Sequence, residues 1–109
     1  MSKRKDELLH MFNTLTPDQL LKEVYMPDEP PQYQLELIDQ VQEDCNLPMP
    51  VFNVLIHYTL GKYYHSLPQL QLMQVAARWM RIGVDSASKA IKYAQAQELY
   101  EEALNFHKN

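Results

Sequence analysis

Cysteine and glycine are both scarce in this sequence of 109 residues, and each shortage excludes a class of site. Cys45 stands alone, so no disulfide can form within the chain and no cysteine pair can bind zinc. His57 and His65 do not have the spacing of metal ligands. Gly61 and Gly83 stand too far apart for a glycine-rich phosphate loop. We therefore expect a cytoplasmic protein that binds no metal ion and no cofactor.

Features of an enzyme are also lacking. No histidine adjoins Cys45 in the sequence to activate it as a nucleophile, and no pair of carboxylates stands out from the general acidity. The uncharged stretch over residues 45–61 is too short, and too closely flanked by prolines, to span a bilayer. We expect no catalytic residue and no enzymatic activity.

The residues that are plentiful favour helix throughout the chain. Leucine, glutamine, alanine, glutamate, lysine and methionine are frequent, and the seven prolines lie outside the periodic segments. We predict an all-α fold, a compact bundle of about five or six helices with a projecting C-terminal helix. The expected helices cover 3–13, two or three turns from Pro17, 32–45, 50–64, 68–82, and a last segment that begins after Asp85 or Ser86 and weakens after Gln95.

Local patterns define several of these helices. Thr16, Pro17 and Gln19 form an N-terminal signal, with threonine as the cap, proline at the first position and glutamine three residues after the threonine. Residues 50–64 are apolar nearly all round, which indicates the central helix of the core. Gly83 is placed to end the helix before it in a left-handed conformation.

The net charge of −4 conceals two lobes of opposite sign. Residues 6–44 contain ten acids and one base, Lys22, whereas residues 62–92 contain five bases and one acid, Asp85. We expect residues 1–109 to form a single domain that is divided in the same way. Its parts are an acidic helical lobe over 1–45, a core with a basic face over 46–95, and an acidic tail over 96–109.

The basic half supplies the candidate DNA-binding residues. Two pairs of cations lie three positions apart, each on one helical face: Arg78 with Arg81, and Lys89 with Lys92. If the glycine turn folds the two helices together, four cations share one surface and can neutralise several phosphates. The alternative is an ordinary solvated face with local pairs to Asp85 or to the acidic lobe.

Lys62 and Trp79 complete the predicted DNA-binding set. Trp79 continues a helical stripe with Leu72 and Val75, which favours a core aromatic. The alternative leaves part of the indole edge exposed, so that it stacks on an unpaired base.

Other polar and aromatic side chains have structural interpretations. Asn53 lies in an apolar helix, so we expect it to bond to the end of a neighbouring helix. Tyr63, Tyr64 and Tyr93 offer either a stacking surface or helix packing, and the sequence leaves both alternatives open.

Two motifs carry a family resemblance. Residues 51–58 read VFNVLIHY, and residues 75–81 read VAARWMR, followed by GVDSASKA at 83–90. With an asparagine inside an apolar helix, then a tryptophan and then a glycine turn, residues 47–95 resemble the DnaD/DnaB-like domain of Gram-positive primosomal proteins. The LTPDQLL at 15–21 also fits the short helix that begins such domains.

The resemblance implies a DNA-replication initiation domain that holds or remodels origin DNA and recruits the helicase-loading machinery. It implies a cytoplasmic, nucleoid-associated chain whose partners are DNA, contacted through the backbone of single or double strands, primosomal proteins, and other copies in a homo-oligomer. Full-length relatives carry an upstream winged-helix region, which these residues do not include. Membrane association of a longer protein has no support in this chain.

The family's DNA-facing residues lie around a Tyr-x3-Ile-x3-Trp pattern that is only partly kept. Val75 and Trp79 hold the last two places, but Gln71 replaces the tyrosine. The alternative function is therefore a protein–protein adaptor or oligomerisation domain of the primosome with little DNA affinity of its own. A helix-turn-helix transcription regulator fits less well, because residues 67–92 lack that motif's short layout.

Overall fold

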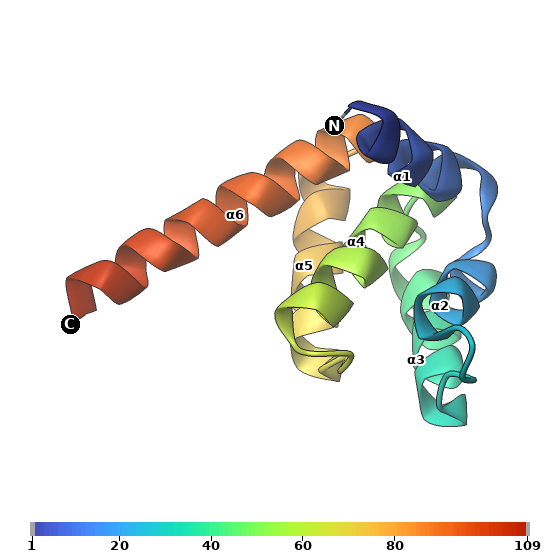
Figure 1. Ribbon diagram of the computed structural model, residues 1–109. Coiled ribbons are helices and arrows are strands. Elements are labelled where there is room, and N and C mark those ends of the chain that lie inside the picture. The colour runs from blue at the N-terminus through green and yellow to red at the C-terminus, as the bar shows by residue number, and fades with distance from the viewer. Residues whose placement is uncertain (1, 109) are drawn as a thin grey trace.

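Six α-helices form the protein in the computed structural model, which describes the main chain of residues 2–108 and the side chains of residues 6–97 (Figure 1). They are α1 (Ser2–Thr14), α2 (Pro17–Tyr25), α3 (Gln32–Cys45), α4 (Met49–Lys62), α5 (Gln69–Ile82) and α6 (Ala87–Lys108). The all-α prediction is confirmed, and the bounds of α1, α3, α4 and α5 lie within two residues of those expected.

Helix α4 is the centre of the bundle. It packs against α1, α2, α5 and α6, while α3 packs against α2 and α5 (Figure 1). Eight of its fourteen residues are buried, among them Phe52, Leu55 and Ile56. A helix covered on most of its sides must be apolar nearly all round, which is the pattern that residues 50–64 carry. The prediction of a central helix is confirmed.

Two predicted helix ends are confirmed in detail. At the start of α2, the Gln19 main-chain N–H donates to Thr16 Oγ1 at 3.2 Å, and the Thr16 N–H donates to Gln19 Oε1 at 3.0 Å. These reciprocal bonds satisfy donors that a helix start leaves free. At the end of α5, Gly83 adopts a left-handed conformation with φ 76°, and the Val84 N–H donates to the Trp79 carbonyl at 3.0 Å.

Helix α6 begins at Ala87 and is capped by Ser86, whose Oγ accepts a hydrogen bond from the Lys89 main-chain N–H at 3.2 Å. Its first turns bury Ala87, Ala90 and Ala94, and small side chains let α6 pack closely against α4. The rest of α6 projects from the bundle, as predicted (Figure 1). The helix continues to Lys108 and does not end where the periodic pattern weakens.

Helix α5 is attached to the core along one face. Leu72, Ala76 and Trp79 are buried, and they recur at helical spacing on the side that meets α3 and α4. The opposite face of α5 therefore points to solvent. None of the helices within residues 2–108 is long and apolar enough to cross a lipid bilayer.

Candidate nucleic-acid interface

The two arginines predicted to bind phosphate lie on the solvent side of α5. Arg78 and Arg81 are both exposed, because the burial of Leu72, Ala76 and Trp79 turns the rest of the helix outward. Neither arginine makes an ion pair with another side chain in the part of the chain whose side chains are described. Both guanidinium groups are therefore available to an external anion.

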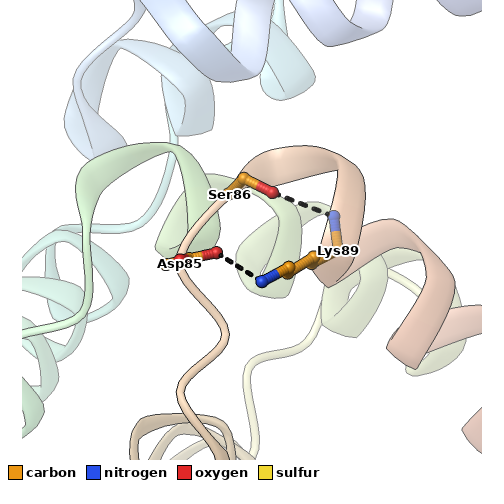
Figure 2. Close-up of polar contacts among 3 residues, drawn as sticks. All are labelled: Asp85, Ser86 and Lys89. Atoms are coloured by element: carbon orange, nitrogen blue, oxygen red, sulfur yellow. Dashed lines mark hydrogen bonds and ion pairs between the residues drawn. The ribbon is translucent and has the colours of Figure 1, made fainter.

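The two lysines of α6 are also exposed, but they differ in their contacts. Lys89 Nζ lies 3.1 Å from Asp85 Oδ1, in the ion pair that Figure 2 shows beside the Ser86 cap. Such exposed pairs contribute only about 0.2–1 kcal/mol, so a phosphate can compete with Asp85 for the lysine. Lys92, one turn further on, has no ion pair among the described side chains.

A shallow surface hollow of about 380 Å³ joins α6 to the end of α5. Its lining residues are Ile82, Gly83, Lys89, Lys92, Tyr93 and Ala96. The hollow thus combines two ammonium groups with an aromatic ring that is 45% exposed. Arg78 and Arg81 do not line it, although Arg78 lies one helical turn before Ile82 on the same side of α5.

Lys62 lies apart from the other predicted cations. It is the last residue of α4, and its Nζ lies 5.8 Å from the centre of the Tyr58 ring and 5.6 Å from that of Tyr63. The chain then turns into the N-terminal end of α5, whereas the hollow adjoins the C-terminal end. A helix of 14 residues is about 21 Å long, which separates Lys62 from the hollow.

Trp79 is a core residue with 1% of its surface exposed. Of the two interpretations left open by the sequence, this exposure matches the core aromatic and leaves no indole edge on the surface for a base. Any contribution of Trp79 to a DNA site must therefore be indirect, through holding α5 in place.

The three tyrosines left ambiguous by the sequence differ sharply in the structure. Tyr63 is half-buried, Tyr93 lines the hollow, and Tyr64 is 90% exposed at the turn between α4 and α5. No pattern in the sequence distinguishes Tyr64 from Tyr63, because the difference depends on the conformation of the turn.

A second hollow, of about 430 Å³, lies in the acidic lobe. Its lining residues are Thr16, Pro17, Asp18, Ile38, Asp39, Gln42 and Met49. Burial, followed by the neighbouring carboxylate of Asp39, raises the pKa of Asp18. A site of this charge repels phosphate, so it is no part of a nucleic-acid surface.

Other chemistry-bearing groups are dispersed. Burial raises the pKa of the Cys45 thiol, with a further contribution from Asp44, and this disfavours a reactive thiolate. Burial lowers the pKa of His57. Within the described residues, no three histidine, cysteine, aspartate or glutamate side chains are grouped so that they could hold a metal ion.

Comparisons with known proteins show a distant similarity to a replication protein. No protein-family model matches the chain, and no solved structure matches it significantly. Over 92 residues, or 84% of this chain, it is 23% identical to the replicative helicase loading/DNA remodeling protein DnaB of Staphylococcus aureus. The chain spans about a fifth of that protein's length, 20%. The similarity supports a distant DnaD/DnaB-like relationship.

Proposed function

We propose that this chain is a non-catalytic DNA-binding or DNA-remodelling domain that acts in bacterial replication initiation, in helicase loading. The observation that carries the proposal is that Arg78 and Arg81 of α5 and Lys89 and Lys92 of α6 are all exposed in a protein whose net charge is −4, and that the two lysines line a hollow that reaches the end of α5. The similarity to a helicase loading/DNA remodeling protein supports the same class of function. We refer to these four side chains as the basic surface.

The proposed mechanism is electrostatic. Each side chain of the basic surface neutralises a backbone phosphate and releases condensed counterions. With four phosphate contacts, the logarithm of the DNA-binding constant should fall with the logarithm of the salt concentration. The expected slope is about −3.6 for duplex DNA and about −2.8 for single-stranded DNA. Because phosphate contacts carry no sequence information, the site holds DNA without selecting its sequence.

The acidic lobe has a complementary role in this proposal. Helices α2 and α3 present exposed carboxylates, among them Glu23, Glu36 and Glu43, which repel DNA. We propose that this side faces primosomal proteins or a second copy of the chain, while the basic surface faces DNA. Opposite charges on the two sides would orient the domain between its partners.

A protein–protein adaptor is the second candidate function. It is favoured by the apolar side chains of Met80 and Ile82, which are about half exposed beside the arginines of α5. The pairing of Lys89 with Asp85 and the glutamine at position 71 favour it as well. In that case the basic surface rims an apolar contact and has little DNA affinity of its own.

Fluorescence anisotropy with labelled single-stranded and duplex DNA, at low and moderate salt, distinguishes the two functions. The test variant replaces Arg78, Arg81, Lys89 and Lys92 by alanine. A matched control replaces two exposed uncharged residues of α6 by alanine: Ser88 and Gln95. Circular dichroism establishes that both variants remain helical.

We expect salt-sensitive binding that the cation variant loses and the control retains. Absence of binding at low salt by the folded domain would refute a DNA site in this chain and favour the adaptor. Binding that the cation variant retains would place the DNA site outside the basic surface.

A further inference from the structure

The turn between α4 and α5 has an unusual main-chain conformation. Tyr64 and His65, neither of them glycine, adopt consecutive left-handed conformations with φ of 53° and 67°. In this region the Cβ atom crowds the carbonyl oxygen that follows, so side chains other than glycine or asparagine rarely adopt it. Interactions with the rest of the protein must therefore hold the turn.

Those interactions come from three helices. The His65 N–H donates to the Leu60 carbonyl of α4 at 2.8 Å. The His65 carbonyl accepts a bond of 3.0 Å from Nε2 of Gln34 in α3, and the Tyr25 hydroxyl of α2 lies 2.9 Å from the same oxygen. Gln34 is only 1% exposed, so its bond is shielded from water. The turn is thereby fixed from outside itself.

The consequence of this conformation is the position of the Tyr64 ring. Tyr63 remains half-buried beneath the ammonium group of Lys62, whereas Tyr64 is 90% exposed. A side chain exposed to this extent contributes little to packing. The protein therefore holds an aromatic ring in solvent on a strained but well-anchored main chain, which is the arrangement of a recognition residue.

The segment that contains Tyr64 carries positive charge and no negative charge along the sequence, while α2 and α3 of the acidic lobe lie against the other side of the turn, with Glu36 in one hollow with Leu67 and Gln69. From Lys62 to Val84 the sequence contains no acidic residue, and it contains three bases, which are Lys62, Arg78 and Arg81. Helix α5 connects the turn to the hollow that contains Lys92 and Tyr93, about 21 Å away. Figure 1 shows the turn after α4 at one end of α5 and the start of α6 beyond the other end. An aromatic ring thus stands near each end of α5, and the positive charge of Arg78 and Arg81 lies in the C-terminal half of this helix.

We propose that Tyr64 stacks on an unpaired base, and that single-stranded nucleic acid follows the outer face of α5 from Tyr64 to the hollow at Tyr93. The phosphates of the strand contact the arginines between these ends. The inference rests on the proposed function, and adds to it the type of strand that is bound and the contact made by Tyr64. Single strands expose base faces for stacking on aromatic side chains, whereas a duplex covers all but its terminal bases.

The conformation of the turn allows a variant that leaves the fold intact. Tyr64→Gly removes the ring and adopts the left-handed conformation without strain, and Tyr64→Phe retains the ring. Tyr33→Ala removes a different exposed tyrosine, on α3 in the acidic lobe, and is the matched control. The probes are a labelled thymidine oligomer of about 16 nucleotides, an abasic strand of equal length, and a duplex.

We expect Tyr64→Gly to weaken binding of the thymidine oligomer by about 5- to 100-fold, which is the usual effect of losing one stacked base. Tyr64→Phe and Tyr33→Ala should bind like the unmodified chain. Binding of the abasic strand and of the duplex should not change with Tyr64→Gly, because neither offers the ring an unpaired base.

Two results overturn the inference. One is unchanged affinity of Tyr64→Gly for the thymidine oligomer, and the other is an equal loss of affinity for the abasic strand. If the alanine variant of the basic surface loses binding while Tyr64→Gly does not, the proposed function stands and the role of Tyr64 fails. If the folded chain binds none of the probes at low salt, both fail.

Discussion

The Nδ2 atom of Asn53 in α4 donates a hydrogen bond to the main-chain carbonyl of Phe12 in α1 over 3.0 Å. The same amide donates to the Leu15 carbonyl at 2.7 Å. Carbonyls at the end of a helix lack partners within that helix, so a buried asparagine from α4 satisfies them. The expectation that Asn53 bonds to a neighbouring helix end is confirmed. This amide fixes the end of α1 to the central helix.

Replacing Asn53 by alanine should therefore destabilise the protein strongly. The change leaves two carbonyls without this donor and creates a small cavity, which together cost about 2–4 kcal/mol. Urea unfolding followed by circular dichroism measures the loss. Asn13→Ala is the control, because exposed Asn13 bonds only within α1, to the Leu9 carbonyl at 3.0 Å, and should cost less than about 0.5 kcal/mol. Equal effects of the two changes would refute the anchoring role.

The two glycines should respond to alanine with opposite signs. A Cβ atom would meet nothing within 4 Å at either position, so only main-chain conformation distinguishes them. Gly61 lies in the last turn of helix α4, where alanine should stabilise by about 0.5 kcal/mol. Gly83 has a φ of 76°, where alanine should destabilise by about 1 kcal/mol. Thermal unfolding compares them, and a shift of the same sign for both would contradict this account.

His57 should make the protein less stable in mild acid. Its ring packs edge-to-face on Phe12 with the centres 5.4 Å apart, and burial lowers its pKa below the usual 6.5. As pH falls, the unfolded chain therefore binds the proton at a higher pH than the folded chain does. The contribution of neutral His57 to stability is complete above pH 6.5 and is lost as pH falls toward the folded pKa. The loss cannot exceed about 1.4 kcal/mol per pH unit for a single group.

Urea midpoints between about pH 7 and pH 5 measure this dependence. His57→Gln should show a weaker dependence on pH than the unmodified chain. His10→Gln, which changes an exposed histidine of α1, should retain it. An unchanged pH profile in His57→Gln would exclude His57 as its source.

Asp18 should have the opposite pH dependence. Burial and the carboxylate of Asp39 raise its pKa above 3.8, so the folded chain binds the proton more tightly than the unfolded chain. Its ionisation therefore lowers stability as pH rises from 3.8 through the folded pKa. Asp18→Asn should raise the melting temperature at pH 7 by about 1–4 °C. This gain should disappear below the unfolded pKa.

An exposed acid of α3 provides the control for this experiment. Glu43→Gln removes one negative charge from the same lobe without relieving the contact between Asp18 and Asp39. It should leave the melting temperature within about 1 °C. An equal gain from Glu43→Gln would attribute the effect to net charge instead of to this pair.

Much of the fold could be predicted because its signals are local. The Thr16–Gln19 capping box, the left-handed Gly83 and the apolar central helix each follow from a few neighbouring residues. The end of α6 could not be predicted in this way. The periodic pattern weakens after Gln95 and predicts an end that projects or frays, and the structure shows that the helix projects and continues to Lys108 (Figure 1).

The candidate site was only partly predictable, and particular residues show why. Residue spacing placed Arg78 and Arg81 on one exposed face, but it grouped Lys62 with cations that lie at the other end of α5. The contrast between Tyr63 and Tyr64 is invisible in the sequence. It arises from bonds to His65 made by Gln34, which lies 31 residues away in the chain.

The sequence by itself determined most helix bounds, the Thr16 and Gly83 caps, the burial of Leu72, Ala76 and Trp79 in α5 (though not that of Ile82, which is exposed) and the separation of acidic from basic residues. These depend on periodicity and on residues a few positions apart, which are properties of the chain before it folds. Only the tertiary structure decided which cations share a hollow, where Asn53 anchors α1, and which tyrosine faces solvent. Those outcomes depend on contacts between residues far apart in sequence, and such contacts exist only once the helices have packed together.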